Sequence, residues 1–284
     1  MGPTTAERLP DFVVIGTMKS GTTTLYRWLD EQPGVRLPEV KEPNFFCDDE
    51  AFRRGTAGYA ARFAGVPRDV LTGEASVRYT DPACSAASAA RLGAVLPEAR
   101  LVCVLRDPVS RLRSHYRHEV QRGRERRPLP EALAEPDNAY LRRSCYERAL
   151  APWAGGFPAD RLHVECFERL FGSEEAWDSL LRFLGLPPAP RPATVHNVTA
   201  AKDAFTPSML ALWEKGLVPS VSRVPRPVRR LARRVLLRPP DANAALLATA
   251  AAPLPEDSLD VLRSQVEHLS ALLPDLRPPW RLQP

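Results

Sequence analysis

A short apolar stretch runs directly into a loop with two glycines and one lysine, and this loop constrains the fold more than any other feature. Residues 12–15 are Phe-Val-Val-Ile, Gly16 and Gly21 bracket the loop with Lys19 inside it, and a helical pattern begins near Thr22. The order strand, loop, helix gathers unpaired N–H groups and the positive end of a helix at one point. The sequence therefore predicts an anion-binding loop.

The position of the lysine separates this loop from the common ATP-binding loop. In the Walker A pattern the lysine directly follows the second glycine, whereas here Thr22 follows Gly21 and Lys19 lies inside the loop. An ordinary strand-to-helix turn is the plain alternative. Strand, spacing and lysine together favour an anion site whose lysine reaches a different oxygen from the Walker lysine.

A second apolar stretch, residues 101–105, ends at Arg106. Ligands of open α/β sheets bind at the carboxyl ends of strands, so Arg106 is expected in a binding site. Asp107 is a good N-cap for the helix that follows, and Gly123 is a plausible stop. On that helix Ser114 would offer a hydroxyl to the same phosphate as Arg106. Solvation is expected for several of the other arginines of the helix, which are Arg111, Arg113, Arg117 and Arg122.

Three segments together carry a resemblance to a known family. They are Gly16-Thr-Met-Lys-Ser-Gly-Thr22, Val40-Lys-Glu-Pro-Asn-Phe-Phe46 and Arg106-Asp-Pro-Val-Ser-Arg-Leu-Arg-Ser114. The first and last resemble the 5′-phosphosulfate loop and the 3′-phosphate motif of sulfotransferases that use 3′-phosphoadenosine 5′-phosphosulfate (PAPS). The second is similar to a segment of the branch that contains heparan sulfate sulfotransferases and many bacterial relatives. With gaps, the resemblance extends from about residue 11 to Trp280.

The resemblance implies a fold and a reaction. The fold is a single α/β domain of the P-loop NTPase type, with a central parallel sheet and helices on both faces. The reaction is in-line transfer of a sulfuryl group from PAPS to a hydroxyl, or less readily an amine, releasing adenosine 3′,5′-bisphosphate. Lys19 would stabilise the leaving group without a metal. The residues expected to bind the donor are Lys19, Ser20, Gly21, Thr22, Thr23, Thr24, Arg106 and Ser114.

Glu42 is the candidate general base, because the glutamate of this segment has that role in the resembling branch. Pro43 favours an extended conformation at Glu42, in which neighbouring side chains point to opposite sides. We therefore expect Lys41 and Glu42 to point apart and not to neutralise each other. The alternative role for Glu42 is a structural carboxylate.

Weaker candidates would contact the acceptor or support the site. Ala75 stands where the heparan enzymes carry a lysine, which argues against a heparan-like acceptor. The five histidines show no metal-ligand spacing, so no metal is expected. The weaker candidates are Lys41, Glu74, Arg78 and, as a second possible base, His196.

One domain accounts for the whole chain. Its 284 residues suffice for a large α/β domain, and no internal repeat demands a second. Apolar stretches at 12–15, 70–73, 101–105 and 162–167 alternate with helical patterns, which favours a parallel sheet. Residues 1–10 are expected to form a flexible lead-in to a domain of residues 11–284.

Basic residues gather in the segment 223–238, where apolar residues recur at helical spacing opposite paired arginines. A lid over the acceptor cleft, or a solvated face, is the favoured interpretation. Binding to membranes or acidic polymers is the alternative.

Cysteine usage and hydropathy indicate the compartment. Five scattered cysteines without a C-x-x-C pair favour a reduced chain. Neither a signal peptide nor an apolar span of about 18 residues is visible. A cytoplasmic bacterial enzyme is expected, with a small-molecule natural product or carbohydrate as acceptor and with neither nucleic acid nor stable membrane association.

Two other functions stay open. A nucleotide kinase or triphosphatase would need the Walker lysine that this loop lacks. A non-catalytic binding module would not need Lys19, Glu42, Arg106 and Ser114 together.

Overall fold

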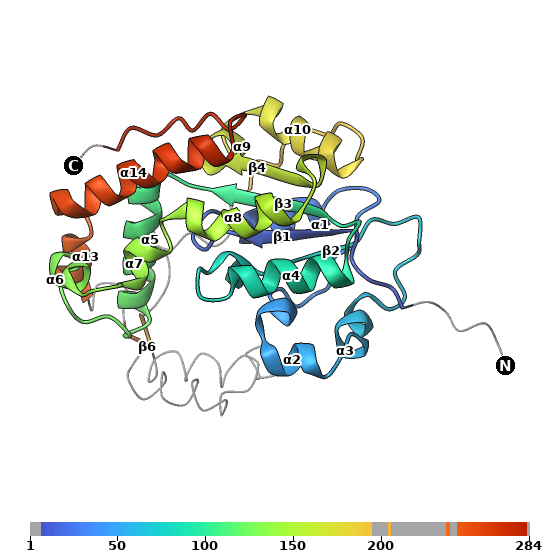
Figure 1. Cartoon of the computed structure of the whole chain (residues 1–284), viewed down its shortest axis with the longest axis horizontal. Coiled ribbons are helices and arrows are strands. Elements are labelled where there is room, and N and C mark those ends of the chain that lie inside the picture. The colour runs from blue at the N-terminus through green and yellow to red at the C-terminus, as the bar shows by residue number, and fades with distance from the viewer. Residues whose placement is uncertain (1–6, 195–203, 206–236, 239–242, 283–284) are drawn as a thin grey trace.

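The computed structural model describes residues 7–194, 204–205, 237–238 and 243–282. Four parallel strands form its central sheet, in the order β2-β1-β3-β4 (Figure 1). The predicted α/β class and parallel sheet are confirmed. The strands are β1 (Phe12–Gly16), β2 (Gly73–Ala75), β3 (Arg100–Leu105) and β4 (Leu162–Cys166).

One strand begins later than the sequence predicts. The prediction was residues 70–73, but Leu71 makes only an isolated bridge to Val35, and the ladder with β1 begins at Gly73 opposite Phe12. Only glycine fits there, because a Cβ on Gly73 would lie 2.5 Å from the Phe12 ring. The shift places Glu74 inside the strand, where it is buried.

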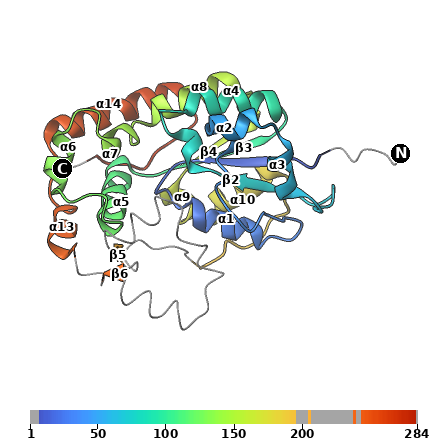
Figure 2. The ribbon, with the colours of Figure 1, turned by 90° about the horizontal axis from the view of Figure 1, so that it is seen from below.

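Helices cover both faces of the sheet (Figure 2). Residues of β1 alternate between two cores: Val13 and Ile15 join one, and Phe12 and Val14 join the other. All four are fully buried, as expected for a parallel strand covered on both sides. The helices of the first core are α4 (Ser85–Val95), α8 (Tyr146–Gly156) and α14 (Glu256–Leu272), and those of the second are α1 (Thr22–Asp30) and α10 (Glu174–Leu184).

A further group of helices packs beyond the carboxyl ends of the strands, to the left of the sheet in Figure 1. Its core includes Leu112, Tyr116 and Leu259. The predicted cap of α5 is confirmed, since Asp107 accepts a hydrogen bond from the backbone N–H of Ser110 at 2.7 Å. These helices are α5 (Pro108–Gln121), α6 (Leu129–Ala134), α7 (Ala139–Arg142) and α13 (Ala244–Thr249).

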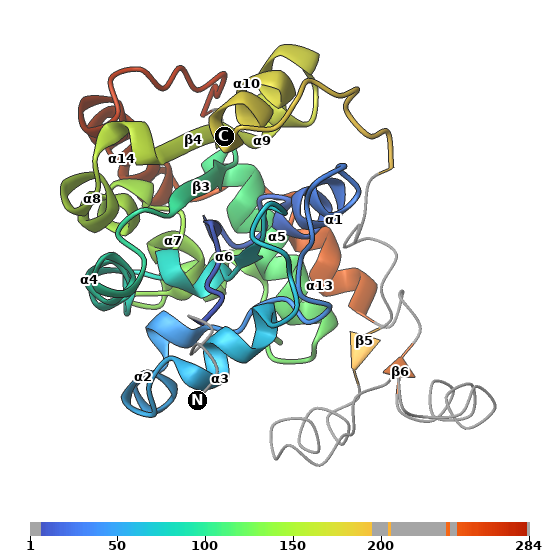
Figure 3. The ribbon, with the colours of Figure 1, turned by 90° about the vertical axis from the view of Figure 1, so that its right-hand side faces the viewer.

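Short elements complete the described chain. An antiparallel pair, β5 (Ala204–Phe205) and β6 (Leu237–Arg238), lies apart from the main sheet (Figure 3). Single turns connect the larger elements: η1 (Phe45–Cys47), α2 (Asp49–Arg53), α3 (Ala57–Ala60), η2 (Ala61–Phe63), η3 (Val77–Thr80), η4 (Ala159–Arg161) and α9 (Phe167–Leu170).

Some predictions fall on other parts of the chain. His196, residues 1–6 of the lead-in and residues 223–236 of the basic segment lie outside the described residues. Among the helices that are described, none combines the length and apolar character needed to cross a bilayer.

Candidate active site

The loop after β1 is shaped by its two glycines. A Cβ on Gly16 would lie 2.1 Å from the Thr80 hydroxyl oxygen of η3, and one on Gly21 would lie 2.7 Å from the Phe171 ring. Gly21 also has φ of 79°, in the left-handed region that favours glycine. Both glycines therefore allow neighbouring segments to close tightly around the loop.

Hydrogen bonds hold the loop against the neighbouring strand. The backbone N–H and the hydroxyl of Thr17 both donate to the Val104 carbonyl, at 2.9 and 3.0 Å. Since the Thr17 hydroxyl has donated its proton, the Ser20 hydroxyl donates to Thr17 Oγ1 at 2.7 Å. Gly21 caps α1 without a side-chain hydrogen bond. The N-terminus of α1 therefore faces the loop without a side-chain cap, as an anion site requires.

Arg106 follows β3 and lies beside this loop. Its Nη1 donates to the Lys19 carbonyl at 3.3 Å, and its guanidinium stacks over the Phe167 ring at 4.7 Å. Tyr146 donates its hydroxyl to the Arg106 carbonyl at 2.7 Å, which holds the backbone in place. Lys19 and Arg106, each of which follows a strand, are thus in contact at one edge of the sheet.

Positive charge around Arg106 is not compensated by carboxylates. Within the described residues Arg106 makes no ion pair, and its Nε is buried without a partner. Burial, and then the charges of Arg113 and Arg106, lower the pKa of Arg117. Ser114 lies on the same helix and is 7% exposed. This arrangement is suited to an added anion.

Arg117 was one of four arginines of which several were expected to be solvated, although its three-residue spacing from Ser114 could have indicated a role. Arg111, another of these four arginines, is not among the solvated ones. Arg111 is fully buried, where it donates to Ser144 Oγ at 2.8 Å and to the Tyr140 carbonyl at 2.5 Å. It packs α5 against the segment that follows α7.

The expectation that Lys41 and Glu42 point apart is wrong. Lys41 Nζ lies 3.0 Å from Glu42 Oε1 and donates to Thr22 Oγ1 at 3.2 Å. The cause is the backbone: Glu42 has φ of 64°, not the extended conformation that Pro43 favours, so the alternation of an extended chain is lost. The pair joins the candidate base to the start of α1.

The turn that carries Glu42 is fastened to β2. The Glu42 N–H donates to the Ala75 carbonyl at 3.0 Å. The Asn44 N–H donates to Ser76 Oγ at 3.1 Å, and Ser76 donates in turn to Glu74 Oε2 at 2.8 Å. Glu74 therefore stabilises the turn indirectly, through its hydrogen bond with Ser76.

Glu74 itself is 2% exposed. Besides Ser76, its carboxylate accepts hydrogen bonds from the hydroxyls of Tyr79 at 2.7 Å and Tyr59 at 3.3 Å. Burial raises its pKa to about 7, although the three hydroxyls and the charge of Lys41 act in the opposite direction. Desolvation thus outweighs hydrogen bonding at this carboxyl.

Arg78, in η3, lines a small hollow together with Thr17, Met18 and Asp81 of the loop and its surroundings. Within the described residues, no group of three or more His, Cys, Asp or Glu side chains is placed to hold a metal ion.

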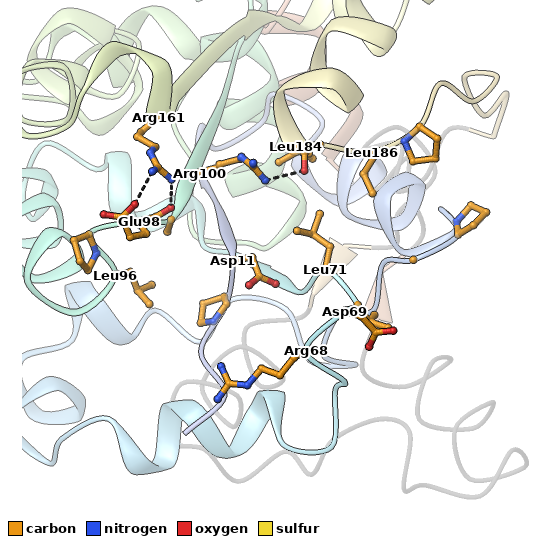
Figure 4. A pocket seen from close by; sticks show the side chains of 18 of the residues that line it. Asp11, Arg68, Asp69, Leu71, Leu96, Glu98, Arg100, Arg161, Leu184 and Leu186 are labelled. Atoms are coloured by element: carbon orange, nitrogen blue, oxygen red, sulfur yellow. Dashed lines mark hydrogen bonds and ion pairs between the residues drawn. The ribbon is translucent and has the colours of Figure 1, made fainter. Parts of the chain in front are cut away.

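One large cavity of the described chain does not coincide with these residues. It has a volume of about 680 Å³ and is lined by Asp11, Arg100 and Arg161, which lie at the amino ends of the strands (Figure 4). Arg100 donates to the Leu184 carbonyl at 2.9 Å, and Arg161 pairs with Glu98 at 2.5 Å. The site described above lies at the opposite, carboxyl edge.

Comparison with known proteins identifies relatives. No family model matches the chain. It is similar to a membrane-associated sulfotransferase of Dictyostelium discoideum, with 37% identity over 116 residues, 40% of this chain and 24% of the relative. It is also similar to heparan sulfate glucosamine 3-O-sulfotransferase 3B1 of Mus musculus, with 28% identity over 176 residues, 58% of this chain and 43% of the relative. The chain thus spans less than half of the length of these curated relatives.

A solved structure agrees with these matches. A sulfotransferase from Alicyclobacillus acidocaldarius superposes with a TM-score of 0.57 at 26% identity, covering 76% of this chain and 94% of that chain. The fold class predicted from the sequence is therefore that of a known sulfotransferase.

Proposed function

We propose that this chain, which belongs to the sulfotransferase family related to the heparan sulfate enzymes, transfers a sulfuryl group from PAPS to an acceptor hydroxyl or, less readily, an amine. The acceptor would be a small-molecule natural product or a carbohydrate. The observation that carries the proposal is a contact, at one edge of the sheet, between two positively charged sites that are suited to bind anions. One is the loop that contains Lys19, and the other is the Arg106 cluster, formed by Arg106, Ser114 and Arg117.

The residues present fit the donor. PAPS has two anionic ends and, when bound, supplies the sulfuryl group. Ser20 to Thr24 and the start of α1 offer N–H groups to the 5′-phosphate, and Arg106, Ser114 and Arg117 offer two guanidinium groups and a hydroxyl to the 3′-phosphate. The second site accounts for positive charges that have no ion pair with a carboxylate among the described residues.

Lys19 would act on the bond to sulfur that breaks, and Glu42 would act on the acceptor that forms the new bond to sulfur. Lys19 stabilises the negative charge that develops on the bridging oxygen as the S–O bond to the 5′-phosphate breaks. Glu42 takes the proton of the acceptor as its oxygen or nitrogen forms the new bond to sulfur. Its side chain is 42% exposed, so an acceptor can reach it. Lys41 orients the Glu42 carboxylate through the 3.0 Å ion pair.

Calorimetric titration separates this proposal from a nucleotide kinase. We expect adenosine 3′,5′-bisphosphate to bind without magnesium and more tightly than ATP with magnesium, since only the former carries a 3′-phosphate. A preference for ATP with magnesium would refute the proposal. Failure to bind the bisphosphate and to transfer sulfate to any acceptor would instead support the binding-module alternative.

A further inference from the structure

A cavity of about 510 Å³ opens between α5, α6 and α7, next to the anion-binding loop. Met18, the neighbour of Lys19, forms part of its wall, and Arg143 Nη1 lies 3.5 Å from the Met18 sulfur. The volume is within the range of about 300–1,000 Å³ for small-molecule sites. Unlike the larger cavity in Figure 4, it lies on the side of the sheet where the reaction is proposed.

The charges that line this cavity cancel. Four arginines and four carboxylates line it, and each arginine is paired: Arg124 with Glu119 at 2.6 Å, Arg127 with Glu125 at 3.0 Å and Glu135 at 2.5 Å, Arg142 with Asp137 at 2.6 Å, and Arg143 with Asp81 at 2.5 Å. This differs from the Arg106 cluster. An anionic ligand entering here would meet no excess of positive charge, because each of these arginines already faces a carboxylate.

Paired charges nevertheless bind hydroxyl groups well. A carboxylate in an ion pair keeps lone pairs for a hydroxyl proton, and a guanidinium keeps N–H groups for a hydroxyl oxygen. Such hydrogen bonds are charge-assisted and stronger than neutral ones. The lining therefore suits a ligand with several hydroxyls and no net charge.

His115 independently indicates a polar ligand. It lines the cavity, is 2% exposed, and its Nδ1 has no hydrogen-bond partner within the described part of the chain. Burial and the charge of Arg111 hold its pKa well below the usual range, so the ring is neutral and offers one donor and one acceptor. A buried polar atom without a partner is costly, and a hydroxyl of a ligand that reaches the ring would satisfy it.

We propose that this cavity binds an uncharged sugar ring of the acceptor and presents one of its hydroxyls to the loop. The inference rests on the proposed function, and it names the substrate class: a neutral glycoside, in preference to an anionic sugar. His115 would determine specificity by hydrogen bonding to a ring hydroxyl.

A matched pair of acceptors tests the charge preference. 4-Nitrophenyl β-glucoside and 4-nitrophenyl β-glucuronide differ only at C6, CH2OH against carboxylate. We expect saturation-transfer NMR with the bisphosphate-loaded protein to detect the glucoside, and kcat/KM for its sulfation to exceed that for the glucuronide by about tenfold or more. Equal or better use of the glucuronide, or no binding of either glycoside, would overturn the inference.

Two variants test the residues, each with a control. Glu135→Gln, at an exposed position, leaves one positive charge uncompensated and should shift the preference toward the glucuronide, whereas Glu50→Gln, in the exposed pair with Arg54, should not. His115→Phe should raise KM for the glucoside without weakening bisphosphate binding. His163→Phe, at a half-buried histidine stacked on Phe183, should leave both unchanged. Unchanged preference in Glu135→Gln contradicts the inference even if His115→Phe fails to fold.

Different experimental results would refute the proposed function and the inference about the cavity. If the bisphosphate binds and another acceptor is sulfated while both glycosides are ignored, only the inference is wrong. If the bisphosphate does not bind, the proposed function is wrong, and the cavity loses its assignment as an acceptor site.

Discussion

Replacing Glu74 by glutamine should flatten the dependence of stability on pH. The folded chain raises the pKa of this carboxyl from 4.5 to about 7, so ionisation costs more in the folded state than in the unfolded chain. The stability contributed by the neutral form is fully present below pH 4.5 and is lost as the pH rises through about 7. Over the whole window, a shift of this size corresponds to a loss of about 3 kcal/mol.

Glutamine is suited to the test because it keeps the shape and removes the charge. Its oxygen can accept from Tyr79 and Tyr59, while its amide donates to Ser76 Oγ. Urea unfolding of both proteins at several pH values between 5 and 8 measures the difference. We expect the wild type to lose about 2–3 kcal/mol more than Glu74→Gln over this range.

Other titrating groups are shared by both proteins and cancel in the comparison. Glu50→Gln, at an exposed ion pair on α2, serves as the matched control and should follow the wild-type curve. Parallel curves for wild type and Glu74→Gln would show that burial does not perturb this carboxyl, and the account of Glu74 as a desolvated support of the Glu42 turn would be wrong.

Three other substitutions test the proposed chemistry. Lys19→Ala should lower kcat by about 100-fold or more, the scale for losing one such donor; near-normal turnover in a radiolabelled sulfate transfer assay would refute its role at the leaving group. Glu42→Gln should abolish transfer and leave calorimetric binding of adenosine 3′,5′-bisphosphate almost intact, and a parallel loss of binding would mean a structural carboxylate. Arg117→Ala should weaken binding of the bisphosphate by about tenfold, as for one lost charge-assisted hydrogen bond, but leave adenosine 5′-monophosphate unaffected. Equal weakening of both nucleotides would remove Arg117 from the 3′-phosphate site.

Local signals in the sequence were sufficient to predict the main strands and the helix that begins after Asp107. The apolar stretches before Gly16 and Arg106 are strands, and the cap at Asp107 begins a helix. These features depend on neighbouring residues only: burial on both faces selects apolar strands, and an unsatisfied helix N-terminus selects a capping side chain. The same signals located the residues that follow each strand.

Contacts between residues that are distant in the sequence could not be predicted from these local signals. Pro43 favours extended backbone at Glu42, yet the hydrogen bond from Glu42 to Ala75 and the bond from Asn44 to Ser76 accompany a left-handed turn that brings Lys41 to Glu42. The burial of Arg111 likewise depends on Ser144, which is distant in the chain. The cationic cluster of Arg106 and Arg117 required the fold to show which arginines have carboxylates beside them.

The sequence by itself determined the order of strand, anion-binding loop and helix, and the displaced Lys19 that separates this loop from an ATP-binding loop. These properties follow from residue spacing along one segment. Only the tertiary structure decided which charges are compensated. Arg124, Arg127, Arg142 and Arg143 meet carboxylates whereas Arg106 does not, because electrostatic interactions depend on distances in space and on burial. In the proposed function, the uncompensated charge near Arg106 binds the anionic donor, and the paired charges bind an uncharged acceptor.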